Sequence, residues 1–156
     1  MTKIINFCKI VCTIKQYGGA NSRVPENDFF GEIIKGQLQG EGSPTKSAYR
    51  NHVEMCKELG LVRKENGDLV LAELGLEYYN AIPSTENGRK LVDRKTDELK
   101  GKLIEIVIAK SELIQREIGK GTIDEYIDNG ETRFLISDQG IEKIDKNFLG
   151  LLTDLG

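Results

Sequence analysis

The sequence predicts a mainly α fold with small β-hairpins, which places the chain in the α+β class. Two observations carry this prediction. In several segments, apolar residues recur three and four positions apart, as they do on one face of an amphipathic helix. In addition, Asn-Gly pairs at 66–67 and 129–130 each separate two short apolar stretches. An Asn-Gly pair in that setting is a strong local signal for a hairpin, because both turn residues take a positive φ.

Two helices are expected in the first forty residues. Residues 2–17 have a wide apolar face and are followed by Gly18-Gly19, which predicts a helix that ends at the glycines. A polar loop is expected next. Either Asn27 or Asp28 is then expected to cap a second helix, because both residue types satisfy the free N–H groups of a first turn.

A third helix is predicted over residues 44–59, because Ser43-Pro44 suits a helix start and Gly60 suits a helix end. Its inner face is expected to consist of Tyr49, Val53, Cys56 and Leu59. The first hairpin follows at residues 61–72. After one more helix, the first domain is predicted to end at Pro83, so that it spans residues 1–83.

Residues 84–156 are predicted to form a second, helical domain with its own hairpin. The order of helix, hairpin and helix occurs in both halves, and corresponding residues lie 63 to 65 positions apart, Gly75 and Gly140 among them. A steady offset indicates duplication. The alternative is coincidence between two helix–hairpin segments in a chain rich in Gly, Ile and Leu.

The apolar segment at residues 102–114 has two interpretations. It is expected to supply the core of the second half, which has few other apolar residues. The alternative is a helix at a dimer interface. The second hairpin is expected to pack on this segment around residues 103–108.

Residues 56–79 read CKELGLVRKENGDLVLAELGLEYY and resemble the end of a winged-helix domain. Members of that family run from the recognition helix through ELGLV and a polar wing tip into an apolar strand ending in Leu-Thr, with a Gly three residues later. Ala72 stands here in place of that Thr, whereas Ser137 keeps a hydroxyl in the second half. The resemblance covers residues 2–82, and residues 86–150 resemble a degenerate second copy. The expected fold is therefore a winged helix, either single or tandem.

The resemblance implies a sequence-specific DNA-binding protein, with transcriptional regulation as its expected use. Helix 44–59 would enter the major groove and the wing at 61–72 would hold phosphates. Double-stranded DNA is the expected partner, and residues 84–156 are candidates for contacts with a second copy or another protein. Two alternatives stay open. One is a protein–protein interaction module, because winged helices also dock proteins. The other is an accessory DNA-binding subunit of a nuclease or restriction system.

The polar face of the third helix and the hairpin carry the side chains expected to contact DNA. Arg and Asn offer forked groups that match guanine and adenine edges, so Arg50 and Asn51 are expected to read bases. Lys and Arg on the hairpin suit phosphates. The predicted DNA-binding residues are Lys46, Ser47, Arg50, Asn51, Lys57, Arg63 and Lys64. The alternative is an ordinary solvated helix face.

Charge and composition limit the possible partners. The chain has 156 residues and a formal net charge of −3, so DNA contact requires a local positive patch. Residues 42–64 provide one, with five basic residues against two acidic ones. No apolar stretch approaches the roughly 20 residues of a membrane span, and no signal peptide is expected. The odd count of 3 cysteines indicates a reducing cytoplasm.

Metal binding and catalysis are not expected. Three thiols and one imidazole could converge on zinc if the first and third helices pack together; these residues are Cys8, Cys12, His52 and Cys56. The favoured alternative is that the cysteines are small core residues, so no metal or cofactor is expected. The stretch from Asp93 to Lys100 includes Glu98 but looks helical and lacks the spacing of a metal-dependent nuclease. The protein is therefore expected not to be an enzyme.

Overall fold

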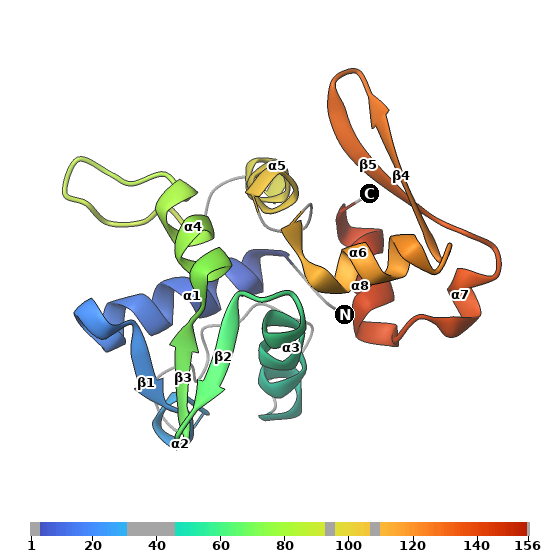
Figure 1. Cartoon of the computed structure of the whole chain (residues 1–156). Coiled ribbons are helices and arrows are strands. Elements are labelled where there is room, and N and C mark those ends of the chain that lie inside the picture. The colour runs from blue at the N-terminus through green and yellow to red at the C-terminus, as the bar shows by residue number, and fades with distance from the viewer. Residues whose placement is uncertain (1–3, 31–45, 93–95, 107–109, 156) are drawn as a thin grey trace.

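The computed structural model describes residues 4–30, 46–92, 96–106 and 110–155. Helix α1 (Ile4–Gly18) lies at the centre of the molecule, with the other elements arranged around it (Figure 1). The apolar side chains of α1 that are fully buried are Ile4, Phe7, Cys8, Ile10, Val11 and Ile14. Since these residues lie on several sides of the helix, α1 is covered on more than one face.

A small sheet and helix α3 cover one side of α1 (Figure 1). The elements of this part are a short 3₁₀ turn (Gly19–Asn21), β1 (Arg23–Pro25), α2 (Glu26–Asp28), α3 (Lys46–Glu58), β2 (Val62–Glu65) and β3 (Asp68–Leu71). All three strands are antiparallel to their neighbours, in the order β1-β3-β2. The first hairpin is therefore confirmed, with Asn66 and Gly67 at φ 51° and 83°.

Two predictions for residues before α3 are corrected. The loop expected after α1 contains strand β1, which pairs with β3; Arg23, for example, lies opposite Val70. Three residues ending in a proline are too few for a strand pattern to be recognised. Helix α2 begins at Glu26, so a cap at Asn27 or Asp28 is wrong. The part of that predicted helix after Phe30 lies outside the described residues.

The chain then returns to the opposite side of α1. Helix α4 (Glu73–Ala81) and helix α5 (Thr96–Ile106) both pack on α1 and on each other. Between them, residues 83–91 form a hairpin-like loop that extends from the end of α4 (Figure 1). Its base is closed by the Leu91 N–H, which donates to the carbonyl of Pro83 over 2.9 Å.

The second half builds a longer hairpin. Its elements are α6 (Glu112–Gly119), β4 (Ile123–Asp128), β5 (Glu131–Ile136), α7 (Gly140–Lys143) and α8 (Lys146–Leu155). The turn at Asn129-Gly130 is confirmed, with φ of 51° and 80°. The expected packing of this hairpin on residues 103–108 is wrong for the described residues 103–106, and residues 107–108 lie outside the described ranges. The helix that β4 packs against most closely is α6, whereas α5 packs on α1 and α4.

The two halves share one hydrophobic core. Leu99 and Leu103 of α5 and Leu151 of α8 are fully buried in the same cluster as the α1 residues, and α8 contacts both α1 and α3. Leu103, Leu113 and Ile114 are buried, as the core interpretation of residues 102–114 predicts, but they belong to this shared core and not to a separate core of the second half. Residues 107–109 lie outside the described ranges. None of the helices in those ranges combines the length and apolar character needed to cross a lipid bilayer.

The helix–hairpin–helix order is repeated down to individual hydrogen bonds. Helix α3 ends at Glu58, and the N–H of Leu61, just after Gly60, donates to the carbonyl of Cys56 over 2.9 Å. Helix α6 ends at Gly119, and the N–H of Thr122, just after Gly121, donates to the carbonyl of Glu117 over 3.1 Å. Both glycines have positive φ, 82° and 77°, as expected for a glycine that ends a helix in the left-handed region.

Leu61 and Thr122 also bind the end of the returning strand through their carbonyl groups. The Leu61 carbonyl accepts from the N–H of Ala72, and the Thr122 carbonyl accepts from the N–H of Ser137, both over 3.0 Å. Leu61 and Thr122 are 61 positions apart, whereas Ala72 and Ser137 are 65 positions apart. The difference arises because β4 and β5 have 6 residues each where β2 and β3 have 4. Two extra residues per strand therefore explain why the offset between the copies drifts along the sequence.

Candidate nucleic-acid interface

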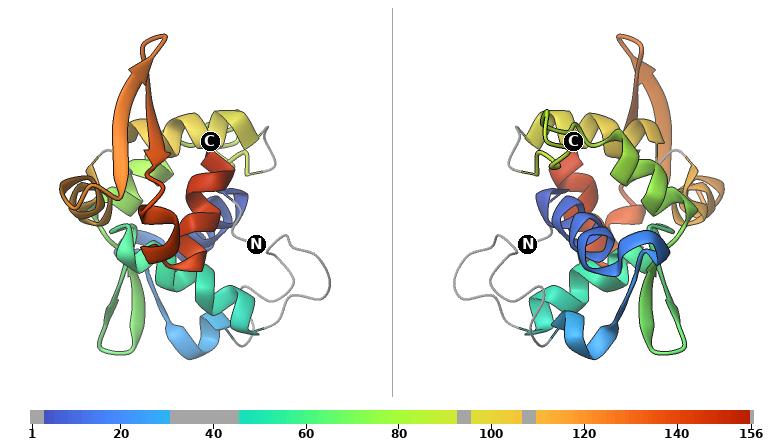
Figure 2. Two further views of the ribbon diagram at one scale, coloured as in Figure 1. Left: turned by 90° about the vertical axis from the view of Figure 1, so that its right-hand side faces the viewer. Right: turned by 90° about the vertical axis from the view of Figure 1, so that its left-hand side faces the viewer.

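The amino-terminal half of α3 and the β2–β3 turn lie at the same end of the molecule (Figures 1 and 2). The buried face of α3 holds Val53, Cys56 and Leu59, as predicted, and also Met55 and His52. Arg50 and Asn51 are exposed. Lys46 and Ser47 begin α3, and their side chains lie outside the described part of the structure.

Arg50 has an aromatic neighbour that the sequence did not indicate. Its guanidinium carbon lies 5.7 Å from the centre of the Phe30 ring, and Phe30 in turn contacts Phe29 edge to face. A guanidinium at that distance is attracted by the electrons of the ring. The contact restrains the side chain at the first described turns of α3 while leaving it exposed to solvent.

The wing residues Arg63 and Lys64 are also exposed, but each is paired with a carboxylate. Arg63 Nε lies 3.1 Å from an oxygen of Glu65, and Lys64 Nζ lies 3.1 Å from an oxygen of Glu26 in α2. Exposed ion pairs of this kind contribute about 0–1 kcal/mol each. A phosphate can therefore replace either carboxylate at small cost, but neither cation is free in this conformation.

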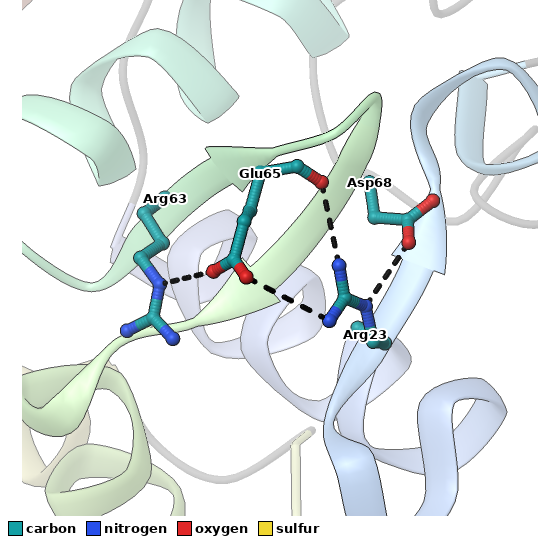
Figure 3. Close-up of polar contacts among 4 residues, drawn as sticks. All are labelled: Arg23, Arg63, Glu65 and Asp68. Carbon is teal, nitrogen blue, oxygen red and sulfur yellow. Dashed lines mark hydrogen bonds and ion pairs between the residues drawn. The ribbon is translucent and has the colours of Figure 1, made fainter.

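A third cation joins the network from β1 (Figure 3). Arg23 Nε donates to Asp68 over 3.0 Å, one of its terminal nitrogens donates to the Glu65 carbonyl over 3.4 Å, and the other lies 3.9 Å from the Glu65 carboxylate. Glu65 is thus shared between Arg23 and Arg63. Among these wing residues and Glu26, three cations are balanced by three carboxylates, so the wing has no net positive charge.

Lys57 lies at the other end of α3 and does not join this group. It is half-buried and pairs with Glu54 over 2.9 Å. The neighbouring Glu58 faces the second half of the chain. Burial raises the pKa of Glu58, and the nearby carboxylates of Asp145 and Glu54 raise it further. Lys57 is therefore at the end of α3 that faces the second half, away from Arg50 and the wing.

The structure thus brings together four of the seven predicted residues, Arg50, Asn51, Arg63 and Lys64. Sequence reasoning missed Arg23, Glu26 and Phe30, which come from the segment between α1 and α3. No local signal identifies them, since their partners lie far away in sequence. For Arg23 and Asp68 the separation is 45 positions.

Removing the shared carboxylate should strengthen any binding of DNA at the wing. The variant Glu65→Gln removes the carboxylate that Arg23 and Arg63 share. An exposed ion pair of this kind contributes about 0.2–1 kcal/mol, which the two cations no longer lose when they bind a phosphate. We therefore expect affinity for random duplex DNA to rise about 1.4- to 5-fold, as measured by fluorescence anisotropy. Glu142→Gln, on the exposed face of α7, removes the same charge elsewhere and serves as the control. An equal gain in both variants would show that only net charge matters.

The cysteines and the histidine lie in the core between α1 and its neighbours. His52 and Asn6 are buried and in contact, with Asn6 Nδ2 and His52 Nε2 3.2 Å apart. Burial raises the pKa of the Cys56 thiol, whereas a hydrogen bond with Cys8 lowers the pKa of Cys12. In the described ranges, no three His, Cys, Asp or Glu side chains are grouped so as to hold a metal ion.

The acidic stretch before residue 100 is helical in the part that is described. Glu98 and Lys100 lie on helix α5, as the sequence predicted, and the Glu98 side chain is exposed. Asp93 lies outside the described residues. Lys100 is half-buried on the same helix, whose inner face packs on α1 and α4.

Comparisons with protein-family models, with curated protein sequences and with solved structures found no match. The functional interpretation therefore rests on the geometry of the chain itself.

Proposed function

We propose that this protein binds double-stranded DNA sequence-specifically and regulates transcription, without an enzymatic activity of its own. The observation that carries the proposal is the placement of Arg50 and Asn51, exposed on α3, at the same end of the molecule as the β2–β3 turn. A helix and an adjacent hairpin of this kind can occupy a major groove and its flanking phosphates together.

The order of elements supports a winged helix over residues 2–82. Helix α1, strand β1, helices α2 and α3, and the β2–β3 hairpin follow one another, and the three strands form one sheet beside α3. The recurrence of α6, β4, β5 and α7 with the same hydrogen bonds supports the tandem form of this proposal. A cytoplasmic location is part of it, in keeping with three cysteines that are free.

In this proposal Arg50 and Asn51 read base edges. Arg63 and Lys64 exchange their carboxylate partners for phosphates as DNA binds. The stacking of Arg50 on Phe30 supplies part of the orientation that a bidentate contact needs. Because the wing is neutral, non-specific binding should be weak at moderate salt, so that specificity depends on α3 more than on attraction by charge.

The decisive test uses a duplex selected from a random pool by the native protein. Arg50→Ala should weaken binding to that site about 5- to 150-fold, the loss expected for one bidentate base contact of about 1–3 kcal/mol. It should change binding to random DNA little. Lys64→Ala should weaken both and lower the slope of log affinity against log salt by about 0.9.

Arg89→Ala is the control for charge, because Arg89 is exposed on the loop after α4, away from α3. If the native protein binds no duplex at about 50 mM salt, or if Arg50→Ala and Arg89→Ala behave alike, this surface does not read DNA. A protein–protein module is then the better function, and the balanced charges of the wing favour it.

A further inference from the structure

The most exposed apolar surface in the described part of the chain belongs to the second hairpin and the helix after it. Five large hydrophobic side chains are exposed in the described ranges, and four of them lie between residues 126 and 141. These four are Tyr126, Ile127, Leu135 and Ile141. Ile127, near the turn, is 76% exposed. Such a concentration on one projecting element marks an interaction surface.

The hairpin stands away from the rest of the fold. It rises beside α6 with its turn at the far end (Figures 1 and 2). In the described residues, β4 and β5 pair only with each other. A two-stranded hairpin has two edges, and an edge strand presents unpaired N–H and C=O groups to any strand that approaches.

The pairing register shows which groups of β4 face outward. Asp128 and Glu131 flank the two-residue turn, and at the base of the hairpin the Ser137 N–H donates to Thr122. In an antiparallel pair, hydrogen-bonded and non-hydrogen-bonded positions alternate. The even-numbered residues of β4 therefore bond to β5, and the backbone groups of Glu125 and Ile127 point to the free edge.

Charge distinguishes the two edges. β4 has three carboxylates and no cation, whereas β5 has one carboxylate and Arg133. A DNA backbone is excluded as the occupant because phosphates would face these carboxylates. Pairing of β4 with β4 of a second copy is disfavoured for the same reason, since each copy would contribute three carboxylates to one short ladder. A strand rich in Lys or Arg removes this repulsion.

We propose that β4 is a docking edge for an extended segment of a partner protein in which Lys or Arg alternates with β-branched residues. The segment adds as a third strand by bonding to the outward groups of Glu125 and Ile127. Because successive side chains of a strand point to opposite faces, its basic side chains lie beside Asp124 and Asp128 on one face, and its apolar side chains lie beside Ile127 on the other. The proposal does not depend on whether α3 reads DNA.

The test uses two labelled synthetic octapeptides, one alternating Lys with Val and the other alternating Glu with Val. Binding to the full chain is followed by fluorescence anisotropy at low salt. We expect the lysine peptide to bind and the glutamate peptide to bind at least about tenfold more weakly. Equal binding of the two peptides would overturn the proposal.

Two proline variants separate strand addition from simple attraction of charge. Ile127→Pro removes an outward N–H of β4, and Thr132→Pro removes an outward N–H of β5, while the bonds between the strands remain. Only Ile127→Pro should weaken binding of the lysine peptide, by about tenfold. If both variants or neither weaken it, the peptide does not add to β4.

A measurement on the native protein covers the case in which a variant fails to fold. Hydrogen exchange at the Glu125 and Ile127 amides should slow when the lysine peptide is added. Unchanged exchange at both amides would overturn the proposal. So would a sedimentation experiment that shows a dimer of the native chain and a monomer of Ile127→Pro, because the occupant would then be a second copy.

Discussion

Replacing Gly75 by Ala should lower the free energy of unfolding by about 3 kcal/mol, the upper part of the usual range for overpacking a core. Gly75 lies in the first turn of α4, where the helix crosses the end of α3 and the start of β2. A Cβ at this position would overlap the carbonyl oxygen of Leu61 and approach its carbonyl carbon to 2.9 Å. That carbonyl cannot move easily, because it accepts the Ala72 N–H.

Urea unfolding followed by circular dichroism measures the effect. Gly101→Ala is the matched control, since Gly101 is exposed within α5 and a Cβ there would meet no heavy atom within 4 Å. That variant should be more stable by about 0.5–1 kcal/mol, because alanine loses less backbone entropy in a helix. A Gly75→Ala protein as stable as the native one would contradict the close approach of α4 to Leu61.

The second half has a glycine in the corresponding position, Gly140, where a side chain would also clash. A Cβ there would lie 2.5 Å from the carbonyl oxygen of Thr122 and 3.0 Å from Ser137 Oγ. Gly140→Ala should therefore also destabilise the protein. The two glycines were recognised in the sequence as corresponding positions, and the structure supplies a physical reason for both. In each half the helix after the hairpin passes directly over the carbonyl that the returning chain uses.

The features that the sequence predicted are those decided by neighbouring residues. An Asn-Gly pair specifies a hairpin turn from within two positions, so both hairpins were predictable. The exposed face of α3 follows from the spacing of its buried residues, so the exposure of Arg50 and Asn51 was predictable as well. The ends of α1 at Gly18 and of α3 just before Gly60 are likewise determined by neighbouring residues.

The features that were missed depend on distant pairing. Strand β1 exists because β3 provides its hydrogen-bond partners, and nothing in residues 23–25 alone requires a strand. The charge of the wing was also misjudged for this reason. The sequence shows Arg63 and Lys64 as adjacent cations, but Glu26 is brought beside Lys64 only when α2 folds against the hairpin.

A test of the whole architecture is the substitution of Leu103 by Ala. This side chain is fully buried on α5, which packs on α1 and α4. Truncating a buried leucine removes apolar contacts and leaves a cavity, so the free energy of unfolding should fall by about 2–5 kcal/mol. Ile141→Ala, at a position that is 52% exposed on α7, should change it by about 0.5 kcal/mol or less.

The experiment also shows which part of the chain loses stability. If the halves share one core, amide signals of Val70 in β3 and Ile123 in β4 should vanish at the same denaturant concentration in the native protein. In Leu103→Ala both should shift together. A shift confined to the signals of residues 110–155 would show that the second half unfolds independently, as a division at residue 83 requires. Because α5 contacts the first half and α8 contacts both α1 and α3, we expect a single transition.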